Sequence, residues 1–207
     1  MELFAALAMC YALSNTQEFF DNNCHETFST YQTQLTNIEI SDEQMDAISK
    51  ITYAEAGNQG SVGITAVTFV ILNRLISKNF GDSIEQIINA KNQFEPATKS
   101  KGWKNLPEPS SSHKKEIKTI LQLIQSGDLQ DPTKGSLYFQ NPLVVASREQ
   151  QGKVSPGLTR FGNSKPSKVI KDHEFYHSIN NDKAKTAVIP SWDIYRKAQE
   201  KQGWMIF

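Results

Sequence analysis

The 207-residue sequence lacks the charge excess and the long hydrophobic runs that mark two large protein classes. Its 22 lysines and arginines balance 22 aspartates and glutamates, so it has no electrostatic footprint of a nucleic-acid binder. No stretch approaches the roughly 20 apolar residues that span a bilayer, which argues against stable membrane insertion. Hydrophobic residues still make up 38% of the chain, which permits a packed core and excludes a disordered protein.

Cysteine is scarce too, since Cys10 and Cys24 are the only two. They form a disulfide if the protein works in an oxidising compartment, or they remain free thiols, and the sequence leaves both open. Residues 3–13 are apolar, but Glu2 stands where a signal peptide carries positive charge, and Met9 is too large for the residue before a lipoprotein cysteine. The sequence therefore does not show by which route the protein would be exported.

Composition divides the chain into three parts. Residues 1–40 are rich in Asn, Gln, Thr and Ser after position 13, and they are predicted to be a weakly ordered N-terminal lead-in or linker. Residues 41–180 hold the periodic apolar segments and form the predicted main domain. Residues 181–207 are predicted to be a C-terminal tail with one short amphipathic turn around Trp192 and Tyr195.

Hydrophobic periodicity predicts an α+β fold that is mostly α, with one short β element. Ser41 and Gln44 form a capping box that begins a helix, and Gly57 is expected to end that helix in the left-handed conformation. The other segments are helices at 62–76 (buried on most sides), 83–90 and 112–125, an irregular segment at 91–112, an extended segment at 136–142, and strand or helix at 169–179.

Glu55 is the residue of this chain best placed for acid catalysis. It lies in the last turn of the first of these helices, four residues after Ile51, on the stripe that Met45, Ile48 and Thr52 also occupy. Burial and the negative end of the helix dipole both disfavour an ionised carboxylate and hold the proton to higher pH. A general acid needs this property near neutrality. The alternative is a helix-end glutamate that turns back to water.

A second pattern, His173-Glu174-Phe175-Tyr176-His177, formally matches a zinc-peptidase motif. On a helix, both imidazoles would face one metal ion and Glu174 would activate the bound water. The remaining histidines, His25 and His113, are poorly placed as a third ligand, and the alternating residues fit a strand equally well. A zinc metallopeptidase is therefore the third function that we consider.

Polar and aromatic residues downstream of Glu55 suit a sugar ligand, because aromatic faces and amide groups match the apolar faces and hydroxyls of a sugar ring. Singly, each of these residues also fits core packing or turn formation. The candidates for substrate binding are Gln93, Tyr138, Asn141 and Tyr176, with Phe94 and Phe139 beside them.

Five short motifs follow one another in the chain, and together they resemble the catalytic domain of the spore cortex-lytic cell-wall hydrolase family over residues 43–178. The resemblance implies a small lysozyme-like domain that cuts the glycan strands of peptidoglycan without a cofactor, typically as a lytic transglycosylase. The motifs are Tyr53-Ala54-Glu55-Ala56, Leu72-Asn73-Arg74, Gln93-Phe94, Asp131-Pro132-Thr133-x-Gly135-x-Leu137-Tyr138-Phe139-x-Asn141-Pro142, and His173-x-Phe175-Tyr176.

The resemblance also implies roles for single residues. Glu55 is the catalytic acid, and His173 and Tyr176 belong to a closing element that binds no metal. Gln59 departs from the family, whose members often carry a second glutamate there. The closest candidates for a second acid are Glu95 and Asp131, so the chain favours a reaction in which Glu55 works alone while Gln93, Tyr138 and Asn141 position the sugar.

These expectations place the protein in the cell envelope, in the periplasm or outside the cell, with peptidoglycan glycan strands as its partner. The weak N-terminal segment favours a phage-like or gene-transfer particle as the setting, with particle proteins as further partners. The alternative to an enzyme is a module that binds peptidoglycan without cutting it, or a structural domain of a virion.

Overall fold

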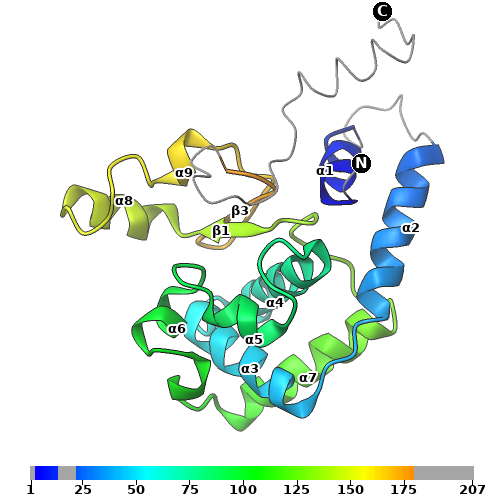
Figure 1. Ribbon diagram of the computed structural model, residues 1–207, viewed down its shortest axis with the longest axis horizontal. Helices are drawn as coiled ribbons and strands as arrows, with labels where there is room; N and C mark the ends of the chain where they lie inside the picture. Colours follow the sequence, from blue (N-terminus) through cyan, green and yellow to red (C-terminus); the bar gives the residue numbers. More distant parts are fainter. Residues whose placement is uncertain (1–2, 14–21, 180–207) are drawn as a thin grey trace, which may run out of the picture.

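The computed structural model describes residues 3–13 and 22–179, which form a mostly helical fold around a small sheet (Figure 1). The predicted α+β class is confirmed. The helices are α1 (Leu3–Leu13), α2 (Asn22–Thr36), α3 (Asp42–Ala56), α4 (Gly60–Ser77), α5 (Ile84–Asn89), α6 (Glu95–Lys99), the 3-10 helix η1 (Trp103–Asn105), α7 (Ser111–Gln125), α8 (Pro142–Gln150) and α9 (Arg160–Asn163). The strands β1 (Tyr138–Gln140), β2 (Lys168–Ile170) and β3 (His173–Tyr176) form an antiparallel sheet in the order β1-β3-β2.

Helix α3 begins as predicted and ends differently. The Ser41 hydroxyl accepts a hydrogen bond from the Gln44 amide at 3.2 Å, and the Gln44 side chain accepts one from the Ser41 amide at 3.1 Å. The expectation that Gly57 closes the helix in the left-handed conformation is wrong, because Gly57 stays right-handed with φ −60°. The left-handed glycine is Gly60, with φ +67°, where the chain turns directly into α4.

Helix α4 is the central helix of the core, as the sequence predicted. It packs against α2, α3, α5, α7 and β2. It is also the one helix of the described part of the chain that is long and apolar enough to cross a membrane, but most of it is buried inside the protein, as in a soluble core helix. Its fully buried apolar residues are Ala66, Val67, Phe69, Val70 and Ile71.

The N-terminal part is more ordered than expected. Residues 22–36 form α2, which corrects the expectation of a weakly ordered segment there. Tyr31 and Leu35 are buried and Phe28 packs against the core, so these three apolar residues form a stripe at helical spacing. The many polar residues between them hid this stripe in the sequence. The boundary at residue 40 remains a prediction, and the tail at 181–207, with the turn around Trp192, lies outside the described residues.

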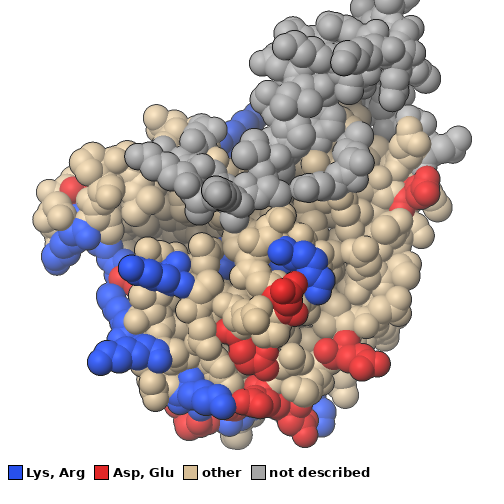
Figure 2. Space-filling view, in the orientation of Figure 1, with Lys and Arg blue, Asp and Glu red and all other residues tan. Residues whose placement is uncertain are grey.

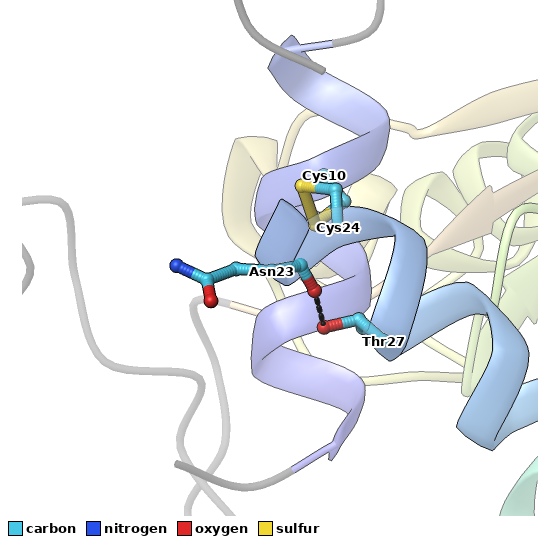
Figure 3. The surroundings of a disulfide bond; sticks show 4 residues. All are labelled: Cys10, Asn23, Cys24 and Thr27. Carbon is cyan, nitrogen blue, oxygen red and sulfur yellow. Dashed lines mark hydrogen bonds between the residues drawn. A yellow bond between two sulfur atoms is a disulfide. The ribbon is translucent and has the colours of Figure 1, made fainter. Parts of the chain in front are cut away.

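A disulfide bond joins α1 to α2, which settles the alternative that the sequence left open. Cys10 and Cys24 are bonded at 2.04 Å, and both are buried (Figure 3). Beside the bond, the Thr27 hydroxyl donates to the backbone carbonyl of Asn23 at 2.7 Å within α2. The N-terminal helix is therefore attached covalently to the helix that contributes Tyr31 to the core.

Asp131 connects three parts of the fold through its buried carboxylate. One carboxylate oxygen accepts hydrogen bonds from the Tyr31 hydroxyl of α2 at 2.7 Å and from the Asn73 amide of α4 at 3.0 Å. The same carboxylate accepts from the backbone amides of Thr133 and Gly135, both at 2.7 Å, in the loop that leads to β1. This candidate second acid is therefore a structural residue.

We expect the disulfide to stabilise the protein by about 3 kcal/mol, the entropy of closing a loop of this length in the unfolded chain. The loop spans 14 residues. Urea unfolding with and without reductant measures the difference. The Cys10→Ser/Cys24→Ser double variant should match the reduced parent and not respond to reductant. Equal midpoints for the oxidised and reduced parent would contradict this expectation.

Asp131→Ala should lower the free energy of unfolding by about 3–5 kcal/mol, because it leaves several buried donors without an acceptor. Asp82→Ala is the matched control, since Asp82 is exposed and exposed sites change stability by less than about 0.5 kcal/mol. Chemical denaturation of both variants tests the expectation. A loss below about 1 kcal/mol for Asp131→Ala would show that the network is not structural.

Candidate active site

A cavity of about 580 Å³ lies between the end of α3, the start of α6, helix α8 and the sheet. This volume is within the range of sites that hold small molecules or short segments of polymers. The side chains around it come from segments far apart in the sequence, and they combine carboxylates, guanidinium groups, amides and aromatic rings. Figure 2 shows lysine and arginine side chains along the left edge of the molecule, whereas the lower edge carries acidic side chains with some basic ones among them.

Glu55 faces this cavity from the last turn of α3. The pKa of its carboxyl group is raised from 4.5 to about 7, chiefly by burial and then by the negative charge of Glu95. Arg74, Arg148 and a hydrogen bond from the backbone amide of Glu95 oppose this increase without cancelling it. Glu55 is therefore protonated in a large share of molecules near neutral pH, as the sequence predicted for this position.

Glu95 is another carboxylate of the cavity, and in contrast to Glu55 it is held in its ionised form. Partial burial alone would raise its pKa, but hydrogen bonds from Lys99 and Arg148 outweigh burial and lower it. Lys99 lies 2.8 Å away within α6, and Arg148 reaches the other carboxylate oxygen from α8. The cavity therefore holds one carboxyl group that keeps its proton beside one that loses it, which is a pattern of acid–base sites.

Arg74 forms the floor of the cavity from α4. It is 3% exposed, and its Nε donates to the backbone carbonyl of Leu137 at 2.8 Å. Its guanidinium group lies over the rings of Phe80 and Phe94 at 4.8 and 4.9 Å. Burial lowers its pKa to about 10, so it remains charged at neutral pH. Its Nη1 is buried and has no hydrogen-bond partner in the described part of the chain.

Three of the four predicted substrate-binding residues line the cavity, namely Gln93, Tyr138 and Asn141. Asn141 also caps α8, because its side chain accepts from the Val144 amide at 3.1 Å. Tyr176 does not line the cavity. It is fully buried on β3, opposite Tyr138 on β1, and its hydroxyl donates to Glu174 at 2.6 Å. Its expected contact with the sugar is corrected to a role inside the sheet.

Gln59 lies in the same cavity as Glu55, but its side chain interacts with another carboxylate. Its Nε2 donates to Asp172 at 3.1 Å, and its Oε1 accepts from the Asp172 backbone amide at 3.3 Å. Gln59 precedes α4 rather than continuing α3, so four residues of separation do not place it one helical turn from Glu55. The amide therefore fixes Asp172 at the turn between β2 and β3.

The zinc-peptidase pattern lies on and just after a strand rather than on a helix. His173 and Glu174 belong to β3, and His177 follows it, so the two imidazoles are not one helical turn apart. Glu174 is engaged by Arg160 at 2.9 Å and by Tyr176. No group of three or more potential metal ligands occurs within residues 3–13 and 22–179. Glu174 therefore serves the sheet.

Sequence reasoning missed Arg148 and Asp172 as cavity residues. Arg148 lies in the last turn of the short helix α8, whose apolar residues are not buried, so no periodic pattern in the sequence marked the direction of its side chain. Asp172 lies in a two-residue turn whose partner, Gln59, is 113 residues away. Contacts over such separations depend on the packing of the whole chain, and a single sequence does not show them. Arg74 belongs to the Leu-Asn-Arg motif, but its place under the cavity was also unexpected.

Comparison with known proteins gives one match. The family model described as Cell Wall Hydrolase matches residues 58–176, more than half of the chain. The match begins three residues after Glu55 and includes α4, α6, α8 and the sheet, which form most of the cavity. No curated protein and no solved structure matches the chain.

Replacing Glu55 tests the electrostatics of the site through stability. The pKa of Glu55 rises from 4.5 to about 7 on folding. The folded parent thus binds the proton more tightly than the unfolded chain and loses stability as pH rises through this window. Glu55→Gln cannot ionise, so below pH 4.5 it should match the parent.

Above pH 7, Glu55→Gln should be more stable than the parent by about 3–4 kcal/mol, because the pKa rises from 4.5 to about 7 and each unit corresponds to about 1.4 kcal/mol. Urea unfolding of both proteins at pH 4 and pH 8 gives the two differences, and the contributions of other titrating groups cancel between them. A difference that does not depend on pH would mean that the carboxyl group ionises normally in the folded protein.

Proposed function

The chain belongs to the cell wall hydrolase family, and on that premise we propose that it cleaves the glycan strand of peptidoglycan as a lytic transglycosylase, with Glu55 as the catalytic acid. The observation that carries the proposal is the carboxyl group of Glu55, held protonated by burial at the wall of the cavity. A module that only binds glycan gains nothing from a desolvated acid, because burying it costs stability near neutral pH.

The reaction follows from the proton of Glu55. Glu55 donates it to the oxygen that bridges two sugars, and the bond from that oxygen to the sugar C1 breaks. The C6 hydroxyl of the same sugar then attacks C1, and the ionised Glu55 takes the hydroxyl proton. The products are a 1,6-anhydro end and a free hydroxyl on the leaving sugar, and Glu55 is protonated again. No water and no second acid take part.

The remaining cavity residues suit a sugar polymer. Tyr138 and Phe139 offer ring faces or edges from β1, and Gln93 offers an amide from the loop before α6. The unpaired Nη1 of Arg74 supplies a buried positive charge for the acidic groups of the strand or for oxygen that gains negative charge. These groups hold the sugar against Glu55 and replace the water that surrounds it in solution.

Cell wall hydrolases act on the cell envelope, and the disulfide between Cys10 and Cys24 fits an oxidising compartment there. The setting in a phage-like or gene-transfer particle, with particle proteins as partners, remains a prediction of the sequence.

Glu55→Gln should reduce glycan cleavage at least about a hundredfold, the usual contribution of a general acid. The variant should keep the parent's circular-dichroism spectrum and unfold cooperatively. Release of soluble fragments from purified sacculi measures the activity. The exposed Glu26 lies on α2, far along the chain from the cavity residues, so Glu26→Gln is the matched control and should behave like the parent. Undiminished turnover by Glu55→Gln would remove Glu55 from the mechanism.

Mass spectrometry of the fragments identifies the reaction. Products that end in 1,6-anhydro-muramic acid support the lytic transglycosylase. Reducing ends would instead mean that water attacks the sugar and that the enzyme is a glycan hydrolase. Cut peptide stems with intact glycan would overturn glycan cleavage, and intact sacculi that retain the protein would identify a binding module.

A further inference from the structure

The cavity holds a second carboxylate that the single-acid mechanism does not use. Glu95 is the first residue of α6, and its backbone amide donates a hydrogen bond to the carboxyl group of Glu55. The two residues therefore lie next to each other although 40 positions separate them in the chain. Building on the proposed function, we propose that Glu95 is a positioning residue for the catalytic acid, and that its negative charge, moderated by Arg148, keeps the proton on Glu55.

The geometry fixes the charge of Glu95 in place. Lys99 binds one of its carboxylate oxygens from the next turn of α6, and Arg148 binds the other from α8. The ion pair with Arg148 thus joins two walls of the cavity, α6 and α8. Lys99 does not line the cavity, whereas Arg148 and Glu95 do, so both members of this ion pair act on Glu55, beside Arg74.

Helix α8 depends on few contacts for its position. None of its residues is buried. Besides the Asn141 cap, Arg148 pairs with Glu95 across to α6. The Glu149 carboxylate accepts from the Gly157 amide at 2.6 Å and from the Thr159 hydroxyl at 2.6 Å. The Arg148–Glu95 pair is therefore the ionic attachment of α8 to α6. Arg148 can act on Glu55 only while this attachment holds.

Other charged and titratable groups also surround Glu55. Arg74 approaches from α4 and is fixed by the Leu137 carbonyl, so its effect is constant. The sheet contributes Tyr138, His173 and, at its turn, Asp172, which Gln59 holds. Burial lowers the pKa of His173, so its imidazole is mostly neutral near pH 7. Glu95 is therefore the negative group that disfavours ionised Glu55, against the two arginines.

This arrangement has a chemical consequence in the proposed reaction. When Glu55 gives up its proton, the new carboxylate faces the fixed charge of Glu95, so like-charge repulsion favours rapid recovery of a proton from the C6 hydroxyl. The same negative charge stabilises the positive charge that develops on the sugar ring as the bond breaks. Glu95 performs both tasks without forming a bond to the substrate.

The test is the pH profile of kcat/KM for glycan cleavage by Glu95→Gln and Arg148→Gln. Glutamine in place of Glu95 still accepts hydrogen bonds but has no charge, so the alkaline limb, where Glu55 loses its proton, should move about 0.5–1 pH unit lower. Removing the charge of Arg148 should move the same limb higher by a similar amount. Activity of Glu95→Gln on the acid plateau should fall less than tenfold.

Two exposed residues provide matched controls for the change in charge. Glu26→Gln on α2 and Lys118→Gln on α7 should leave the limb within about 0.2 pH unit of the parent, because screening weakens exposed charges at such distances. Shifts of opposite sign for Glu95→Gln and Arg148→Gln, with unmoved controls, support the proposal. A purely structural Glu95 would not produce them.

Two results would overturn the proposal. If the alkaline limb of the pH profile moves in neither variant, Glu95 does not act on Glu55. If Glu95→Gln loses about a hundredfold at every pH, as Glu55→Gln is expected to, Glu95 acts directly in a mechanism with two carboxylates. If the parent protein itself does not cleave glycan, the proposed function is wrong, but the proposed effect of Glu95 on Glu55 can still be tested. NMR titration of the Glu55 side-chain carbon in both variants then still decides between opposite shifts, which support the proposal, and unshifted midpoints, which overturn it.

Discussion

Partial burial of the Glu55 carboxyl group is the constraint on which the rest of the site depends. The group sits in the last turn of α3, where burial favours its neutral form, and the direct turn at Gly60 sends the chain into α4 across the base of the cavity. Two arginines act against burial. The Leu137 carbonyl anchors Arg74 through its Nε, and Glu95 anchors Arg148.

The N-terminal helices belong to the same framework. Asp131 receives hydrogen bonds from α2 and α4 and from the loop that delivers Tyr138 to the cavity. The disulfide then holds α1 on α2. The described N-terminal segment is thus part of the support of the cavity rather than an appendage, and this explains how a short sheet of three strands can present a wall of the site. The buried hydrogen bonds of Asp131 stabilise the fold, whereas the burial of the Glu55 carboxyl group disfavours its ionised form.

The sequence could predict what local patterns control. The capping box at Ser41, the apolar stripe that leads to Glu55 and the extended segment at β1 all follow from spacing and side-chain chemistry. The sequence could not show the partners of Arg148 or the burial of Tyr176, because both follow from contacts between segments distant in the chain. Helix α2 was missed for another reason, because polar residues outnumber the apolar ones that form its buried stripe. The disulfide could not be predicted because its formation depends on whether the compartment is oxidising.

The most direct measurement is the titration of the Glu55 side-chain carboxyl carbon in the parent protein by NMR, with Glu55→Gln used to assign the signal. The account predicts a midpoint at about pH 7, because the folded protein holds this proton more tightly than water-exposed glutamate does. A midpoint near 4.5, the ordinary value for glutamate, would contradict it, since Glu55 would then be ionised at neutral pH and could not supply the proton.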